Sequence, residues 1–86
     1  MTKTYQQLQQ LDAAHHIHPF NDNAELARSG TRILTRGEGC YVWDAEGNKM
    51  LDAFAGLWCV NIGYGRKELG RAAAQQMDTL AYYNSF

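Results

Sequence analysis

The sequence has few residues that would cross-link or anchor a protein. Its 86 residues include one proline and only two cysteines, Cys40 and Cys59, which show neither a CxxC spacing nor a dense framework. We therefore expect reduced thiols and no disulfide. No segment approaches the roughly 20 apolar residues of a membrane span, and the first 20 residues hold no apolar run of signal-peptide length. These absences predict a cytoplasmic protein.

An excess of charge of one sign is also lacking. Lysine and arginine number 8, aspartate and glutamate number 9, and no block of like charge exists. Nucleic-acid binding needs a basic face that displaces counterions, so this class is excluded, as is a membrane surface. His15, His16 and His18 lie close together, but a structural zinc site needs about four ligands and the two cysteines are not suitably spaced. We expect no metal, and histidines at a helix end or an interface.

What is present is a pattern of short helices around a small β-meander. Thr4 caps a helix over 4–15, with Gln7 as its capping-box partner. Asp22 caps a second helix that ends near Ser29, with Glu25 at the capping-box position and Gly30 as terminator.

Three strands and a longer helix follow. The strands are expected at 31–36, 40–43 and 49–54, with a turn at 37–39 and a hairpin loop at 44–48 in which Gly47 is left-handed. The longer helix is expected at 66–80, its buried side marked by Leu69, Ala73, Met77 and Leu80. A three-stranded meander is marginal alone, so we predict an α+β segment that belongs to a larger body.

Residues 50–65 are the most informative stretch, because an apolar strand runs into an aromatic loop punctuated by glycines. Loops normally solvate their tips, yet this one places Leu57, Trp58 and Cys59 in succession. It is interpreted as a pocket wall, or as a segment covered by more protein. Other aromatic residues also stand at element ends, where loops build pockets: Phe20, Tyr82, Tyr83 and Phe86. The pattern leaves open that they fill a core or an interface.

Other chemistry has weaker support. Lys3, Lys49 and Lys67 lie in polar surroundings, so none is expected to act as an imine-forming lysine. The run 63–65, Gly-Tyr-Gly, precedes a helix and could bind an anion at the helix N-terminus. It is neither a Walker loop nor a dinucleotide fingerprint, so a simple loop-to-helix turn is favoured.

Three motifs resemble a known family. They are residues 13–20, 35–49 and 55–66, with the sequences AAHHIHPF, TRGEGCYVWDAEGNK and AGLWCVNIGYGR. In order and spacing they are similar to the start of class III aminotransferases, and within that class to omega-transaminases of the amine–, putrescine– and beta-alanine–pyruvate type. Ornithine-type members usually carry a Gly-His pair followed by His-Pro, from which the run 63–66 departs.

The resemblance implies an N-terminal segment of a fold type I, pyridoxal-phosphate-dependent transferase that works as a homodimer. Such enzymes move an amino group from an amine donor to a keto acid such as pyruvate. Their imine-forming lysine, the aspartate at the pyridine nitrogen and the phosphate-binding Gly-Ser loop would all follow Phe86. The 86 residues alone are thus expected to hold no catalytic residue, to bind little pyridoxal 5'-phosphate and to be inactive.

The resemblance also implies site residues and a division of the chain. Leu57, Trp58 and Cys59 match the loop on the substrate side of the cofactor, Phe20 an aromatic residue at the pocket mouth, and Phe86 one that serves the partner subunit's site. The division is an N-terminal helical arm at 1–30, the meander and pocket loop at 31–65, and at 66–86 a helix leading into the large cofactor-binding domain. The alternative is a small stand-alone interaction module that binds a protein partner through its aromatic loop.

Overall fold

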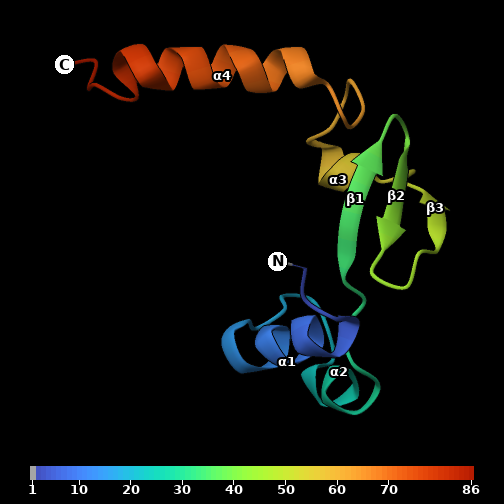
Figure 1. Ribbon diagram of the computed structural model, residues 1–86. Helices are drawn as coiled ribbons and strands as arrows, with labels where there is room; N and C mark the ends of the chain where they lie inside the picture. The colour runs from blue at the N-terminus through green and yellow to red at the C-terminus, as the bar shows by residue number, and fades with distance from the viewer. Residues whose placement is uncertain (1) are drawn as a thin grey trace.

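The chain folds into two short helices, a three-stranded sheet, a one-turn segment and a long helix (Figure 1). The computed structural model describes residues 2–86. The elements are α1 Tyr5–His15, α2 Asn23–Ser29, β1 Leu34–Glu38, β2 Tyr41–Asp44, β3 Lys49–Leu51, α3 Ala55–Trp58 and α4 Lys67–Leu80. The predicted set of short helices, antiparallel meander and one longer helix is confirmed.

The helix ends lie where the capping residues placed them. The Thr4 hydroxyl accepts a hydrogen bond from the Gln7 backbone N–H at 3.2 Å, and the Gln7 side chain accepts one from the Thr4 N–H at 2.9 Å. Asp22 accepts from the Glu25 N–H at 3.1 Å, and Gly30 ends α2 with a φ of 77°. These caps satisfy N–H groups that have no partner inside a helix, so their local sequence fixes the boundaries.

The sheet is antiparallel, in the order β1-β2-β3. The predicted turn at 37–39 is wrong, because Gly37 and Glu38 pair with Val42 and Tyr41 as the end of β1. The predicted third strand is too long, because pairing stops at Leu51 and the following residues turn away. The turn of the first hairpin thus falls at residues 39–40, where Gly39 has a φ of 58°, and Asp52 and Tyr64 bond to the backbone of these two residues.

The predicted hairpin loop at 44–48 is confirmed, and a buried carboxylate organises it. Asp44 is only 4% exposed. Its oxygens accept hydrogen bonds from the Glu46 N–H at 3.0 Å, the Asn48 N–H at 2.9 Å and the Asn48 side-chain amide at 3.0 Å. Gly47 adopts the expected left-handed conformation, with a φ of 89°.

This loop should weaken in acid. The hydrogen bond from the Asn48 side chain lowers the pKa of Asp44 below its ordinary value of 3.8, although burial opposes this. Since the folded pKa is the lower one, the stabilisation is complete above about pH 4 and is lost as the pH falls through the folded pKa. A carboxyl-carbon NMR titration should show Asp44 titrating below 3.8, and Asn48→Ala should move its pKa upward. An Asp44 that titrates above that value in the unaltered chain would contradict this account.

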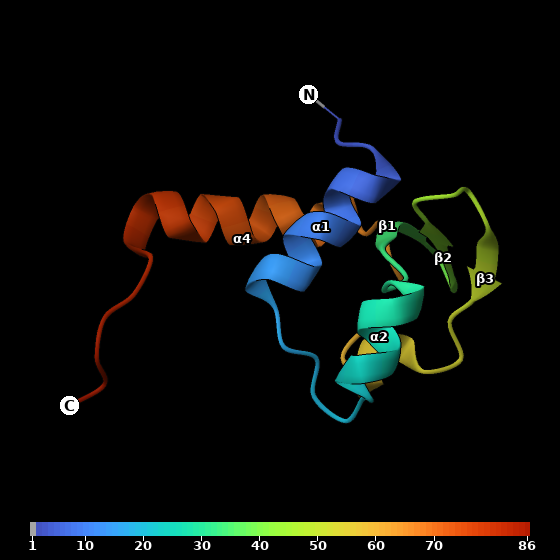
Figure 2. The same ribbon diagram turned by 90° about the horizontal axis from the view of Figure 1, so that it is seen from below.

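The chain has almost no hydrophobic core of its own. Val42, 9% exposed, is the one buried apolar residue among those that the structure describes. The radius of gyration is 16.6 Å, against about 12 Å for a compact domain of this length. Helix α4 projects away from the sheet and from α1 and α2, so that the C-terminus lies far from the other elements (Figures 1 and 2).

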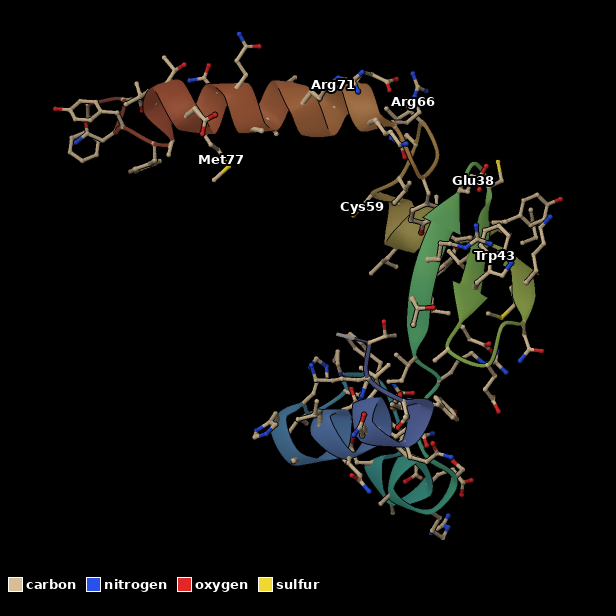
Figure 3. The ribbon with its side chains drawn as sticks, in the orientation of Figure 1. Glu38, Trp43, Cys59, Arg66, Arg71 and Met77 are labelled. Atoms are coloured by element: carbon tan, nitrogen blue, oxygen red, sulfur yellow. The ribbon has the colours of Figure 1, made fainter. Side chains whose placement is uncertain are left out.

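The predicted buried side of α4 is therefore wrong for the described chain. Leu69, Met77 and Leu80 are 52%, 66% and 56% exposed, and Ala73 is exposed as well. Figure 3 shows the Met77 side chain standing clear of the sheet. The amphipathic pattern is real, but within residues 2–86 no other element packs against it. None of the described helices is both long enough and apolar enough to span a membrane.

Candidate functional site

The predicted aromatic loop begins with a turn of unusual handedness. Four successive residues of α3 have positive φ: Ala55 at 48°, Gly56 at 57°, Leu57 at 66° and Trp58 at 64°. Only glycine adopts this left-handed conformation freely, and other residues pay roughly 1–2 kcal/mol each. Such strain persists where neighbouring structure imposes it, and it gathers at ligand-binding and active sites.

Asp52 holds this turn. One oxygen of its carboxylate accepts a hydrogen bond from the Phe54 N–H at 3.1 Å. The other accepts from the Gly56 N–H at 3.0 Å and from the Tyr64 hydroxyl at 2.5 Å. The bond from Tyr64 is the main reason why the pKa of Asp52 is lowered, and the same bond raises the pKa of Tyr64. At neutral pH the pair is therefore a carboxylate and a neutral phenol.

Tyr64 in turn ties the loop to the hairpin. Its backbone forms a bridge with Gly39, with N···O distances of 2.9 and 3.1 Å. Its ring covers Gly37, where a Cβ atom would lie 2.6 Å from the ring. Gly63 and Gly65, with φ of 85° and 79°, allow the chain to enter and leave this bridge. The run 63–65 is thus a loop-to-helix turn, as the sequence favoured, fixed against the sheet.

Sequence reasoning did not find this network. Asp52 and Tyr64 are 12 residues apart, and neither lies in a pattern that announces a contact. The one local signal is an aspartate two residues before Phe54 and four before Gly56, a spacing at which its side chain can accept from both N–H groups.

Three of the predicted site residues lie together on the turn. Leu57 and Trp58 are 56% and 79% exposed, and Cys59 is exposed as a free thiol. The Cys59 S–H donates to the Leu57 carbonyl at 3.2 Å. Figure 3 shows Cys59 beside the sheet, between it and the start of α4. The turn thus holds two large apolar side chains outward in adjacent positions.

The other two predicted residues are elsewhere. Phe20 lies in the connection between α1 and α2, with a φ of 55°, and Phe86 is the last residue beyond α4. Both side chains are fully exposed. In Figure 1, α1 and α2 lie below the sheet and the C-terminus lies at the far end of α4, so these two residues are not gathered around Trp58.

The three lysines of the chain lie away from the aromatic loop or on the surface. The Lys49 ammonium stands 4.1 Å from the centre of the exposed Tyr41 ring and 5.5 Å from that of Trp43, on the open face of the sheet. Lys3 and Lys67 are exposed. None of the three lysines is enclosed by apolar side chains, as an imine-forming lysine usually is.

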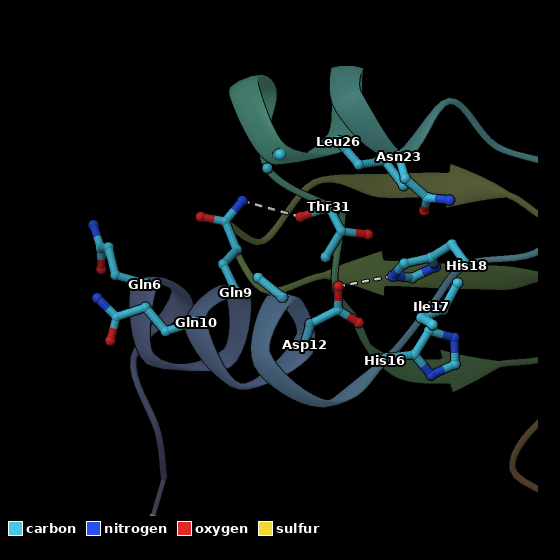
Figure 4. Close-up of a pocket in the computed structure, with 13 residues that line it drawn as sticks. Gln6, Gln9, Gln10, Asp12, His16, Ile17, His18, Asn23, Leu26 and Thr31 are labelled. Carbon is cyan, nitrogen blue, oxygen red and sulfur yellow. Dashed lines mark hydrogen bonds and ion pairs between the residues drawn. The ribbon is translucent and has the colours of Figure 1, made fainter.

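A groove of about 630 Å³ lies between α1 and α2 (Figure 4). On it the His18 ring nitrogen lies 2.7 Å from an Asp12 oxygen, and the Gln9 side chain donates to the Thr31 carbonyl at 3.0 Å. Helix α1 ends at His15, so the histidines lie at a helix end. No group of three side chains suited to a metal occurs in the described part of the chain.

The sequence that forms these elements matches a known class of protein. The model of the family "Aminotransferase class-III" matches residues 24–86. The chain therefore belongs to the class-III aminotransferase family.

Individual relatives agree with this assignment. The chain is 58% identical over 78 residues to the putrescine–pyruvate aminotransferase of Pseudomonas aeruginosa, covering 91% of this chain and 17% of that protein. A thermostable (S)-enantioselective omega-transaminase from Thermomicrobium roseum superposes with a TM-score of 0.94 at 50% identity, over 100% of this chain and 19% of that one. A thermostable omega transaminase with a tryptophan replaced by glycine superposes with a TM-score of 0.85 at 35% identity, over 92% and 18%. The chain thus spans about a sixth to a fifth of the length of these relatives.

Proposed function

We propose that residues 1–86 are the N-terminal segment of a fold type I aminotransferase that moves an amino group from an amine donor to a keto acid such as pyruvate. The 58% identity to a putrescine–pyruvate aminotransferase over 91% of the chain carries this proposal. The exposure of sixteen large apolar side chains supports it, since soluble proteins rarely leave so much apolar surface uncovered. On this proposal the remaining four fifths of the fold, and a second subunit, cover that surface in the cytoplasm.

Pyridoxal 5'-phosphate, which this family uses, would supply the electron sink for the reaction when bound. The residues of this chain would shape the space beside it. We assign the donor-facing wall to Leu57, Trp58 and Cys59, the pocket mouth to Phe20 and a contribution to the partner subunit's pocket to Phe86. In this division, residues 1–30 form an N-terminal helical arm and residues 31–65 form the meander with the pocket loop. Residues 66–86 form the helix that leads into the cofactor-binding domain.

The geometry of the turn supports the role of Trp58. A strained, left-handed turn holds a rigid indole outward, which is useful if the ring must limit the size of the donor. The related transaminase whose tryptophan is replaced by glycine is described as engineered for asymmetric synthesis of enantiopure bulky amines. We propose that Trp58 sets the same kind of limit here.

The test is to express the full-length protein encoded by the reading frame that contains these residues. We expect it to retain pyridoxal phosphate, to dimerise and to form alanine from pyruvate with putrescine or another amine as donor. The isolated 86-residue chain should bind no pyridoxal phosphate saturably and should melt broadly, because it has little core. A full-length protein without transaminase activity would contradict the proposal. A sharp, cooperative melt of the isolated monomer would favour the interaction module instead.

A further inference from the structure

We propose that Asp52 and Tyr64 are positioning residues of the donor pocket, which hold the left-handed turn and so determine how Leu57 and Trp58 face the amine. This inference rests on the proposed function. It concerns two side chains that are not part of the proposed pocket wall and whose contact with each other the sequence did not predict.

The first step is that the turn does not fix its own shape. Its backbone bonds, from Trp58 N–H to Phe54 C=O at 3.0 Å and from Cys59 N–H to Ala55 C=O at 2.9 Å, would form in a turn of either hand. Leu57 and Trp58 favour the right-handed form by sterics. Something outside the turn must therefore select the left-handed form.

The second step is that Asp52 supplies this selection. Its carboxylate accepts from the N–H groups of Phe54 and Gly56 at 3.1 and 3.0 Å, which fixes the backbone where the turn begins. Hydrogen bonds to an ionised acceptor are roughly twice as strong as neutral ones. At Gly56 a Cβ atom would lie 2.9 Å from the Val60 side chain and 3.2 Å from the Tyr64 oxygen, so a side chain there would displace these neighbours.

The third step is that Tyr64 fixes the carboxylate relative to the sheet. The phenol donates to Asp52 at 2.5 Å, while its ring lies over Gly37 of β1 and its backbone bridges Gly39. The Asp52 N–H already donates to the Cys40 carbonyl of the hairpin at 2.8 Å, and the Tyr64 hydroxyl adds a side-chain link that orients the carboxylate. Removing that hydroxyl leaves the ring and the bridge in place but takes away one of the three donors that hold the carboxylate.

The experiment compares Tyr64→Phe with Tyr41→Phe in the full-length protein. Tyr41 lies on β2, and its hydroxyl has no hydrogen-bond partner among the described residues, so the two variants lose the same atom from different surroundings. Amide hydrogen exchange is measured for peptides covering 54–60, together with kcat/KM for a compact and a bulky amine. We expect Tyr64→Phe to speed exchange at the turn about tenfold and to change the ratio of the two kcat/KM values about three- to tenfold. Tyr41→Phe should change neither.

Asp52→Asn provides the second variant. The amide has one acceptor atom where the carboxylate has two, so it cannot serve all three donors, and we expect a larger effect of the same kind. Equal exchange in Tyr64→Phe and Tyr41→Phe would overturn the proposal. Faster exchange with an unchanged ratio would show the anchor but overturn its role in the pocket. Absence of any transaminase activity in the unaltered protein would refute the proposed function, while exchange would still report whether Tyr64 anchors the turn.

Discussion

Replacing Trp58 by glycine in the full-length protein is expected to shift donor preference toward bulky amines by about 10- to 100-fold in relative kcat/KM. The indole is 79% exposed on a turn that holds it outward, so it is free to contact a substrate. A tryptophan buries about 150–250 Å² when it is covered. Its removal takes apolar contact away from a compact amine, and it opens space that a bulky amine can fill. Steady-state kinetics with a series of amines of increasing size measures this shift.

Trp43→Gly is the matched control for that variant. Trp43 lies on β2, its ring stacked by the Arg36 guanidinium at 3.7 Å, and it faces away from the turn. We expect it to leave the order of donors unchanged. Unchanged selectivity in Trp58→Gly, with loss of pyridoxal phosphate, would instead assign Trp58 to holding the cofactor.

The sequence predicted well those features whose cause is local. The Thr4–Gln7 box, the Asp22 cap and the left-handed Gly47 each depend on residues within four positions of one another. The side chain and the N–H groups that it serves are joined by a short stretch of chain. Propensity and capping rules therefore place such boundaries before any tertiary contact is known.

Features that depend on distant contacts were not predictable in the same way. Around α3 the contacts join residues far apart in the sequence, since Tyr64 donates to Asp52 while its ring covers Gly37 of β1. The apolar side of α4 was correctly identified as a face, but periodicity cannot say whether anything covers it. At the candidate site, resemblance pointed to Leu57 and Trp58 and gave no hint of the network that holds them.

The left-handed turn itself makes a prediction whose sign is opposite to ordinary helix behaviour. At an interior position of a right-handed helix, glycine is less stable than alanine by about 1 kcal/mol. At Leu57, where φ is 66°, alanine retains a Cβ atom that clashes with the backbone and glycine does not. We therefore expect Leu57→Gly to be more stable than Leu57→Ala by about 1 kcal/mol, measured by denaturant unfolding of the full-length protein.

The comparison isolates the backbone because both variants lose the leucine side chain and differ by one methyl group. The control is the same pair of substitutions at Met77, inside the right-handed helix α4, where alanine should be the more stable by about the usual amount. If alanine is favoured at both positions, the turn is right-handed in solution, and the network of Asp52 and Tyr64 has no strain to hold. If glycine is favoured at Leu57 alone, the left-handed turn destabilises the fold and is kept because it turns Trp58 outward. This is expected where the placement of a residue serves a substrate.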